Sequence, residues 1–267
     1  MVLAYERETS QSAKNAIAQI LINSKMCALG KRPICQDTGI VNVFVEVGMS
    51  VEWDSELSLE DMINEGVRRA YNEPDNRLRA SIVSDPLFGR KNTQDNTPAV
   101  IHTKIVKGSK LDITVAAKGG GSENKSKFTV LNPDDSLTDW VLKTVPKMGA
   151  GWCPPGMIGI GVGGTAEKAM LMAKSSLMEP IDINEIKDKS NPSEIEKLRI
   201  DLFNKINALG IGAQGLGGLT TVLDVKINDY PTHAASLPVA MIPNCASTRH
   251  VHFSLDGSGV AELPKVD

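Results

Sequence analysis

The chain has 267 residues, of which 41% are hydrophobic and 23% charged, and its formal net charge is −3. This length can bury a substantial core and fits one large domain or two closely joined lobes, while the composition excludes a disordered tail or a collagen-like repeat. The small net charge and the 4% aromatic content argue against nucleic-acid binding, which needs clustered basic and stacking side chains.

The N-terminal half predicts two helices and three strands from its hydrophobic pattern. We expect the helices at 10–29 and 58–72 and the strands at 39–51, 100–106 and 111–117. Ser58 and Asp61 are placed like a capping box at the start of the second helix. We expect the last two strands to pair as a hairpin across Lys107 and Gly108.

The C-terminal half predicts a similar mixture. We expect helices at 138–144, 165–178 and 193–209, with Pro146 stopping the first of them, and strands at 157–160, 220–227 and 238–242. The polar stretch 182–192 has the composition of a surface connection. The whole pattern predicts a mixed α/β (α+β) fold, with mixed sheets flanked by helices, and allows two lobes that meet near residue 150.

Two uncharged stretches, 148–166 and 230–248, reach the length of a membrane-spanning helix. Internal prolines break both, and glycines or polar residues dilute them, so we expect no membrane segment. Charged residues at 6–8 stand where a signal peptide would carry its apolar stretch. We therefore expect a cytoplasmic protein.

The chain has four cysteines, and no two of them form the CxxC unit of a zinc ribbon. A disulfide framework is also unexpected, because it belongs to short secreted domains. Cys27 shares one face of the predicted 10–29 helix with Ala13, Ile17 and Ile20. We interpret it as a small core residue.

The other three cysteines, Cys35, Cys153 and Cys245, lie in proline-containing, loop-like sequence. Three thiols on distant loops are typical of ligands that a fold gathers around a soft metal centre. A 4Fe-4S cluster usually has four thiolate ligands. With three, one iron would stay open to bind a substrate oxygen as a Lewis acid. The alternative is that all three are ordinary buried thiols.

Two glycine-rich segments could carry chemistry. Residues 118–125 could turn several backbone N–H groups toward a carboxylate or phosphate, although a surface hairpin tip explains the pattern equally well. Residues 159–164 match GxGxxG. In a dinucleotide fold the acidic residue that follows ends a second strand, whereas Glu179 ends the predicted helix itself. We therefore favour close packing of a strand against a helix.

Three of the four histidines, His233, His250 and His252, lie near the C-terminus together with Arg249 and close to Cys245. They form either a functional site or a set of structural, hydrogen-bonded side chains. His102, within a predicted strand, is interpreted as structural.

Four segments taken together resemble the iron-sulfur (class I) fumarate hydratases and the related L-tartrate dehydratases, specifically the alpha subunit of the two-subunit forms. The resemblance covers nearly the whole chain, and its specificity comes from four motifs in the right order at long spacings. They are 33–39 (PICQDTG), 119–126 (GGGSENKS), 153–165 (CPPGMIGIGVGGT) and 230–253 (YPTHAASLPVAMIPNCASTRHVHF).

The resemblance implies a 4Fe-4S cluster, held by Cys35, Cys153 and Cys245 with one open iron, and reversible hydration of fumarate to L-malate. Cys27 is outside this pattern. Reversible addition of water across a dicarboxylate needs acid-base groups and anion-binding groups beside the open iron.

The resemblance also assigns roles to individual residues. It implies that Gln36 and Asp37 contact the substrate, with Asp37 as a proton carrier, although Asp37 could instead only cap the turn before Gly39. It directs His233 at the substrate and matches Arg79 to a carboxylate-binding arginine. The loop glycines are expected to donate backbone N–H groups to a carboxylate; they are Gly119, Gly120 and Gly121.

The family further implies partners. A beta subunit or second domain contributes more basic residues and a proposed catalytic base, and nothing in this chain corresponds to it. We therefore expect a half-enzyme that is inactive without its beta subunit, together with alpha-alpha pairing. The leading substrate pair is fumarate and malate, and dehydration of L-tartrate to oxaloacetate is the alternative. A non-catalytic binding or assembly protein of the same fold is the alternative from another class.

Overall fold

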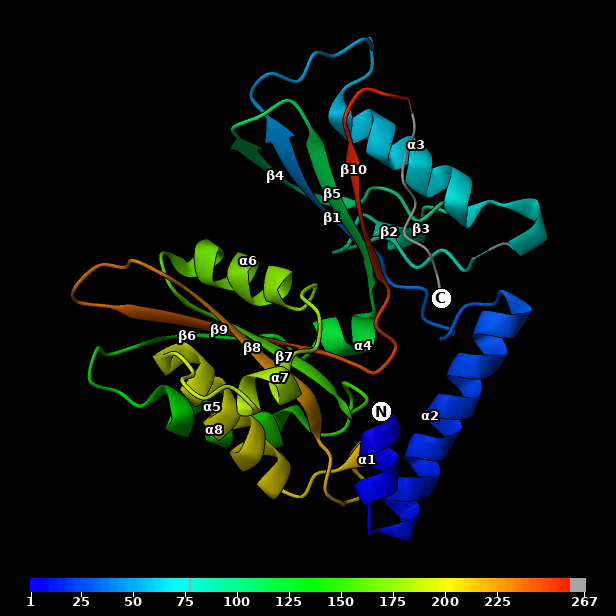
Figure 1. The fold of residues 1–267 in the computed structure, drawn as a ribbon. Coiled ribbons are helices and arrows are strands. Elements are labelled where there is room, and N and C mark those ends of the chain that lie inside the picture. The colour runs from blue at the N-terminus through cyan, green and yellow to red at the C-terminus, as the bar shows by residue number, and fades with distance from the viewer. Residues whose placement is uncertain (77, 260–267) are drawn as a thin grey trace. The chain divides into compact units, whose positions relative to one another are not determined.

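The computed structural model describes residues 1–76 and 78–259 and divides the chain into two compact units (Figure 1). The first unit comprises residues 1–29 and 121–247, and the second comprises residues 30–120 and the segment from 248 onward. The expected junction near residue 150 lies inside the first unit. Both units combine helices with a sheet that contains parallel and antiparallel strand pairs, which confirms the mixed α/β fold.

The first unit is built on a four-stranded sheet in the order β6-β9-β7-β8 (Figure 1). Strands β7 and β8 run parallel, whereas β9 is antiparallel to both β6 and β7. The strands are β6 (Lys127–Leu131), β7 (Gly156–Gly163), β8 (Val222–Tyr230) and β9 (Leu237–Asn244).

Helices cover both faces of this sheet. Helix α6 (Ala166–Ser176) packs on one face, while α5 (Leu137–Met148) and α8 (Glu194–Ala208) contribute to the core on the other face (Figure 1). The capping box expected at Ser193 and Glu196 is present at the start of α8. These apolar layers hold the strand ends that carry two of the cysteines.

The GxGxxG segment forms the second part of β7 and the residue after it. A Cβ added to Gly159 would lie 2.1 Å from the carbonyl oxygen of Ala173, and one added to Gly161 would lie 2.0 Å from that of Ala169. Only glycine lets α6 approach the strand this closely. The expected close packing of a strand against a helix is confirmed.

Among the remaining helices of the first unit, α2 is the long one. Its buried residues Ala13 and Ile17 pack with Ala213, but its second half is largely exposed and Cys27 is only half-buried. The expected core position of Cys27 is therefore wrong, because the helix residues on both sides of it are exposed. The helices of this unit outside the two layers on the sheet are α1 (Val2–Arg7), α2 (Gln11–Gly30), α4 (Gly120–Glu123), α7 (Ile183–Lys187) and the 3₁₀ turn η2 (Ala213–Gly215).

The second unit has a four-stranded sheet in the order β10-β5-β1-β4, with α3 (Leu59–Tyr71) packed against it. Ser58 caps α3 as expected, accepting a hydrogen bond from the backbone of Asp61. The strands of this unit are β1 (Ile40–Gly48), β4 (Val100–Val106), β5 (Leu111–Lys118), β10 (His250–Leu255) and the small pair β2 (Val83–Ser84) and β3 (Lys91–Asn92), with a 3₁₀ turn η1 (Pro74–Asn76) before them.

The hairpin expected between 100–106 and 111–117 is wrong. Strand β1 lies between β4 and β5, and the turn at Lys107 and Gly108 wraps around its end. Val41, Val43 and Val45 are buried in β1, as suits a central strand, whereas β4 is an exposed edge. Burial of β1 thus outweighs the short connection that favours a hairpin.

Two further expectations from the sequence differ from the structure, one for the end of α5 and one for the stretch 182–192. Helix α5 continues through Pro146 to Met148, because a proline in the last turn removes only one hydrogen bond. The stretch 182–192 contains α7, in which Ile183 and Ile186 are each 1% exposed. These two isoleucines fix a helical turn in otherwise polar sequence. No helix in the described parts of the chain is long and apolar enough to cross a membrane.

Candidate functional site

The antiparallel pairing of β7 with β9 brings Cys153 and Cys245 to one end of the first unit's sheet. Cys153 precedes β7 by three residues, and Cys245 directly follows Asn244, the last residue of β9, which pairs with Met157. A Cβ added to Gly156 would lie 1.9 Å from the Asn244 carbonyl oxygen and 3.0 Å from the Cα atom of Cys245. The two cysteine segments are therefore in close backbone contact.

The Cys153 loop is held in an uncommon conformation. Cys153 has a φ of 58°, in the left-handed region, and its N–H donates to the carbonyl of Ala150 at 2.9 Å. The backbone N–H and the side-chain Nε2 of Gln214 both donate to the Pro154 carbonyl, at 2.7 and 2.9 Å. Trp152 is completely buried just before the cysteine. Such non-glycine outliers cluster at functional sites, where the surroundings hold them in place.

Gln214 is a further residue at this loop that no sequence motif indicated. It lies in η2, within a segment that has five glycines between residues 210 and 218. That glycine density is the signal that could have pointed to a tight loop packed against another backbone. The contact partner, Pro154, is 60 residues away and could not be inferred from the pattern.

Asp37 organises the end of the second unit's sheet at which β1 begins and β5 ends. Its Oδ1 accepts a hydrogen bond from the backbone N–H of Gly39 at 2.9 Å, and its Oδ2 accepts one from Gly120 at 2.7 Å. The Nη1 of Arg249 donates to the Asp37 carbonyl oxygen. These groups meet because β5 is antiparallel to both β1 and β10, so its end adjoins the starts of the other two strands. Asp37 therefore caps the turn before Gly39, the role that the sequence offered as the alternative for this residue.

The neighbours of Asp37 bring three further expected residues into the same unit. Cys35 is half-buried and Gln36 is exposed. The hydroxyl of the buried Thr38 donates to the backbone carbonyl of Arg79, whose side chain is exposed. Cys35, Gln36, Asp37 and Arg79 therefore share one region of the second unit.

The glycine loop divides between the two units. Gly119 and Gly120 belong to the second unit, and the Gly120 N–H is already donated to Asp37. Gly121 belongs to the first unit, where an added Cβ would lie 3.2 Å from the carbonyl oxygen of Gly151. The segment is thus an ordered strand-to-helix connection into α4, not a hairpin tip.

His233 lies at the other end of the first unit's sheet. It follows β8, whose last residue, Tyr230, pairs with Gly163 at the far end of β7, whereas Cys153 and Cys245 adjoin the start of β7 (Figure 1). At about 3.3 Å per residue, the length of β7 separates these ends by roughly 23 Å. His233 is exposed, and its Nδ1 accepts a hydrogen bond from the backbone of Ala235 at 3.1 Å. The structure does not bring it together with either cysteine of its own chain.

The other histidines lie in the second unit. His250 and His252 are on β10, where partial desolvation lowers the pKa of His250 and the Nδ1 of His252 lies 3.0 Å from the hydroxyl oxygen of Thr114. His102 on β4 stacks on Phe44, with ring centroids 5.2 Å apart, which supports its structural interpretation. His233 thus does not form one cluster with His250 and His252 within either unit.

None of the four cysteines forms a disulfide bond. Within the described residues, no three His, Cys, Asp or Glu side chains come together as a metal-binding group. The donor set nevertheless fits an iron-sulfur centre chemically, because soft thiolates are the ligands that such centres use. Two of the three expected thiols share one sheet end, and Cys35 belongs to the other unit.

Comparisons with known proteins agree with this set of motifs. The chain is 36% identical to a Methanocaldococcus jannaschii protein assigned as an L(+)-tartrate dehydratase alpha subunit, over 92% of this chain and 86% of that protein. It is 28% identical to the L(+)-tartrate dehydratase alpha subunit of Escherichia coli, over 94% of this chain and 82% of that subunit.

It is also 29% identical to the anaerobic class I fumarate hydratase of Escherichia coli, over 97% of this chain. The chain spans about half the length of that enzyme, 48%. The sequence profile of the fumarate hydratase (Fumerase) family matches residues 1–254. With nearly the whole chain matched, the protein belongs to the fumarate hydratase family.

Proposed function

We propose that this chain is the alpha subunit of an iron-sulfur hydro-lyase that catalyses the reversible hydration of fumarate to L-malate. Membership of the fumarate hydratase family supports the reaction class. The observation that carries the site is the antiparallel pairing of β7 with β9, because it gathers Cys153 and Cys245 at one sheet end.

The cluster ligands in this proposal are Cys35, Cys153 and Cys245. When bound, a 4Fe-4S cluster with an open iron supplies Lewis-acid polarisation of a hydroxyl oxygen. The half-buried Cys245 and the exposed Cys153 sit on loops whose backbone is fixed by strand pairing and by Gln214. Cys35 precedes the Asp37 turn and would supply the third thiolate.

The chain's own polar groups would bind and orient the dicarboxylate. The exposed guanidinium of Arg79 would pair with one carboxylate, and Gln36 would donate an amide hydrogen bond. Asp37 would carry a proton on a carboxylate whose position is fixed by the N–H groups of Gly39 and Gly120. Because Gly120 donates to Asp37, its role in this proposal is to position Asp37. The family resemblance remains the ground for assigning Gly119 and Gly121 to a substrate carboxylate.

A beta subunit would complete the active site. This proposal is supported by coverage, since the chain spans 86% and 82% of two tartrate dehydratase alpha subunits but only 48% of a fumarate hydratase. We also propose that alpha chains pair, since His233 lies far from the cysteines of its own chain. In that arrangement a second alpha chain would present His233 to the substrate.

L-Tartrate dehydration is the second candidate function. The 36% identity to the Methanocaldococcus protein favours it. Turnover of fumarate, malate and L-tartrate by this chain mixed with its beta partner under anaerobic conditions separates the two reactions. Activity toward tartrate without activity toward fumarate or malate would exclude the leading assignment.

Reconstitution with iron and sulfide tests the cluster independently of activity. We expect broad visible absorption from the wild-type chain, a lower iron content in Cys153→Ser, and an unchanged iron content in Cys27→Ser, since Cys27 lies on α2 outside the motifs. Equal iron content in wild type and Cys153→Ser, without visible absorption, would support a non-catalytic binding or assembly protein instead.

A further inference from the structure

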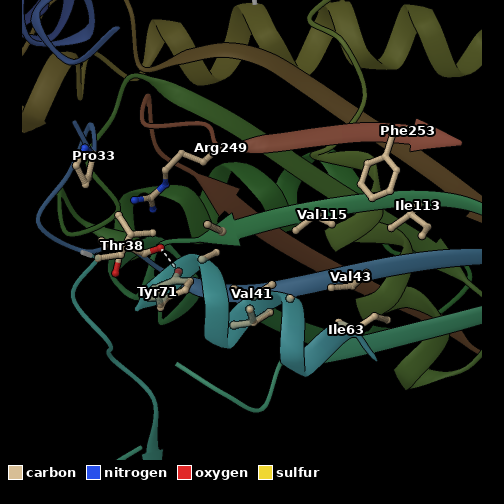
Figure 2. Close-up of a pocket in the computed structure, with 15 residues that line it drawn as sticks. Pro33, Thr38, Val41, Val43, Ile63, Tyr71, Ile113, Val115, Arg249 and Phe253 are labelled. Carbon is tan, nitrogen blue, oxygen red and sulfur yellow. Dashed lines mark hydrogen bonds between the residues drawn. The ribbon is translucent and has the colours of Figure 1, made fainter. Parts of the chain in front are cut away.

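The second unit contains a cavity of about 500 Å³ between α3 and the strands β1, β5 and β10 (Figure 2). Its wall is made almost entirely of aliphatic and aromatic side chains, among them Val41, Val43, Ile63, Ile113, Val115 and Phe253. No acidic side chain lines it. This space adjoins the apolar core of the unit, where dense packing is the norm.

The volume is too large for a packing defect. A dry apolar cavity of about 150 Å³ is already sufficient to bind benzene, and ligand pockets typically measure about 300–1,000 Å³. The cavity falls within that second range. The side chains that line an empty apolar space of this size lack many dispersion contacts, and a bound apolar molecule would provide them.

Small residues on α3 give access to the cavity. Gly66 and Ala70, one helical turn apart, both line the cavity and are both exposed to solvent. A Cβ added to Gly66 would meet no atom within 4 Å. Glycine is less favourable than alanine inside a helix, so this position keeps an entrance open at the expense of helix stability.

One end of the cavity is polar. Figure 2 shows Arg249, Thr38 and Tyr71 at that end, with Phe253 and Ile113 at the other. The Tyr71 hydroxyl donates to the Thr38 carbonyl at 2.8 Å, and the Thr38 hydroxyl donates to the carbonyl of Arg79. The hydroxyl hydrogens of Tyr71 and Thr38 are therefore already donated, whereas Arg249 has N–H groups left to donate.

The guanidinium of Arg249 is incompletely satisfied. Its Nη1 donates to the Asp37 carbonyl, but its buried Nε has no hydrogen-bond partner among the described residues. A buried, unsatisfied donor is costly, and a charged one more so. A carboxylate is the group that pairs best with such a guanidinium, because it can accept two N–H groups at once.

We propose that this cavity binds a medium-chain carboxylate, with its carboxylate at Arg249 and its alkyl chain extending toward Phe253. Phe253 lies on β10 and Arg249 directly precedes that strand, and their separation of four residues corresponds to about 13 Å of extended chain. That length suits an extended alkyl chain rather than a compact dicarboxylate such as fumarate. A bound carboxylate would also affect the Asp37 turn, because Arg249 donates a hydrogen bond to the Asp37 carbonyl oxygen.

Calorimetric titration of the full chain with decanoate, below its micellar concentration, tests this proposal. We expect saturable binding at one site and about fourfold weaker binding for each methylene removed, so that octanoate binds about fifteenfold more weakly. Decanol should bind at least tenfold more weakly than decanoate, because it lacks the charge that Arg249 recognises. The chain is titrated before iron and sulfide are added, so failure of the proposed cluster does not affect the result.

Two pairs of proteins make the result specific. Arg249→Met should bind decanoate and decanol equally, whereas wild type prefers decanoate. Gly66→Leu, which places a side chain in the entrance, should lose binding of both, while Gly66→Ala should retain it. Thermal melting of each variant confirms that it is folded.

Three outcomes would overturn the proposal. The first is no saturable decanoate binding by wild type, and the second is equal affinity of wild type for decanoate and decanol. The third is a wild-type dimer in sedimentation that Gly66→Leu abolishes, which would identify a second copy of the chain as the occupant.

Discussion

Asp37 has one role that the geometry establishes and another that we propose. Both carboxylate oxygens accept backbone hydrogen bonds, from Gly39 and from Gly120, and these bonds fix the turn before β1. A carboxylate has about four acceptor sites, so these two bonds leave capacity for a substrate proton. A substitution must therefore separate the loss of the turn from the loss of chemistry.

We expect Asp37→Asn to lose both functions to different extents. Its amide NH₂ would face one of the two backbone N–H groups, which lowers the free energy of unfolding by about 1–3 kcal/mol. Turnover should fall at least about a hundredfold, because the amide cannot carry the proton. Asp95→Asn is a matched control, since Asp95 is half-buried in the same unit and also accepts through both oxygens, from Thr97 and Arg68. A turnover for Asp37→Asn as high as that of Asp95→Asn would leave Asp37 with the structural role alone.

Gly156 fixes the contact between the two cysteine segments of the first unit. Any side chain at this position would overlap the Asn244 carbonyl, 1.9 Å from the Cβ position. The strands would have to separate where Cys153 and Cys245 come together. At this position, stability and the proposed binding of the cluster would therefore be coupled.

Gly156→Ala should lower the free energy of unfolding by about 3 kcal/mol, measured by urea denaturation, and should reduce iron uptake during reconstitution. Gly66→Ala is the control, because its Cβ meets nothing within 4 Å in helix α3. That variant should be more stable by about 0.5–1 kcal/mol with unchanged iron uptake. Full stability of Gly156→Ala would mean that the strand ends are not held as closely as described.

A buried ionic network ties α7, α8 and β8 together. Lys226 contacts Asp182 at 2.5 Å and Asp224 at 3.3 Å, and Arg199 contacts the same two carboxylates at 2.5 and 3.2 Å. Burial opposes ionisation of Asp182, but hydrogen bonds from Arg199 and Lys226 and their charges outweigh it and lower the pKa of that carboxyl. The network explains how the polar stretch before α8 becomes ordered.

Lys226→Met should lower the free energy of unfolding by about 3–5 kcal/mol, because it leaves the fully buried Asp224 without one of its cations. Lys205→Met is the matched control. It removes an exposed pair with Asp201 on α8 and should cost less than about 0.5 kcal/mol. Chemical denaturation of both variants measures the difference, and equal losses would contradict a dominant role for the buried network.

The sequence predicted those elements whose signals are local. The helices capped by Ser58 and Ser193 lie within one residue of the expected boundaries, because the capping residues contact only their own first turn. Strand pairing depends on residues far apart in the chain. The spacing of the sequence pattern could therefore not reveal that β10 pairs with β5, or that β1 lies between β4 and β5.

The same distinction applies to the candidate site. The motifs identified Cys35, Asp37, Cys153 and Cys245, because each interrupts the pattern with a loop or turn. Which of these residues meet within one unit follows from strand directions, which a motif does not carry. Gln214 was missed for that reason, and the distance of His233 from the cysteines became visible only with the register of β8 on β7.

His233 raises the question of how one site could use all the proposed residues. Within one chain, the length of β7 separates His233 from the sheet end that carries Cys153 and Cys245. An exposed turn at a sheet end can reach a neighbouring subunit. In a symmetric pair of alpha chains, each chain would supply its cysteines to one site and its His233 to the other.

Mixing two inactive alpha chains tests this arrangement directly. We expect Cys153→Ser and His233→Asn to be inactive alone with the beta partner. After dissociation and equal remixing, half of the pairs contain one of each chain, and one of their two sites has intact Cys153 and His233. Turnover should therefore recover to about a quarter of the wild-type value. A mixture of Cys153→Ser with Cys245→Ser is the control and should stay inactive, because both cysteines serve the same site. No recovery in the first mixture would exclude a shared site, and full activity of His233→Asn alone would remove His233 from the mechanism.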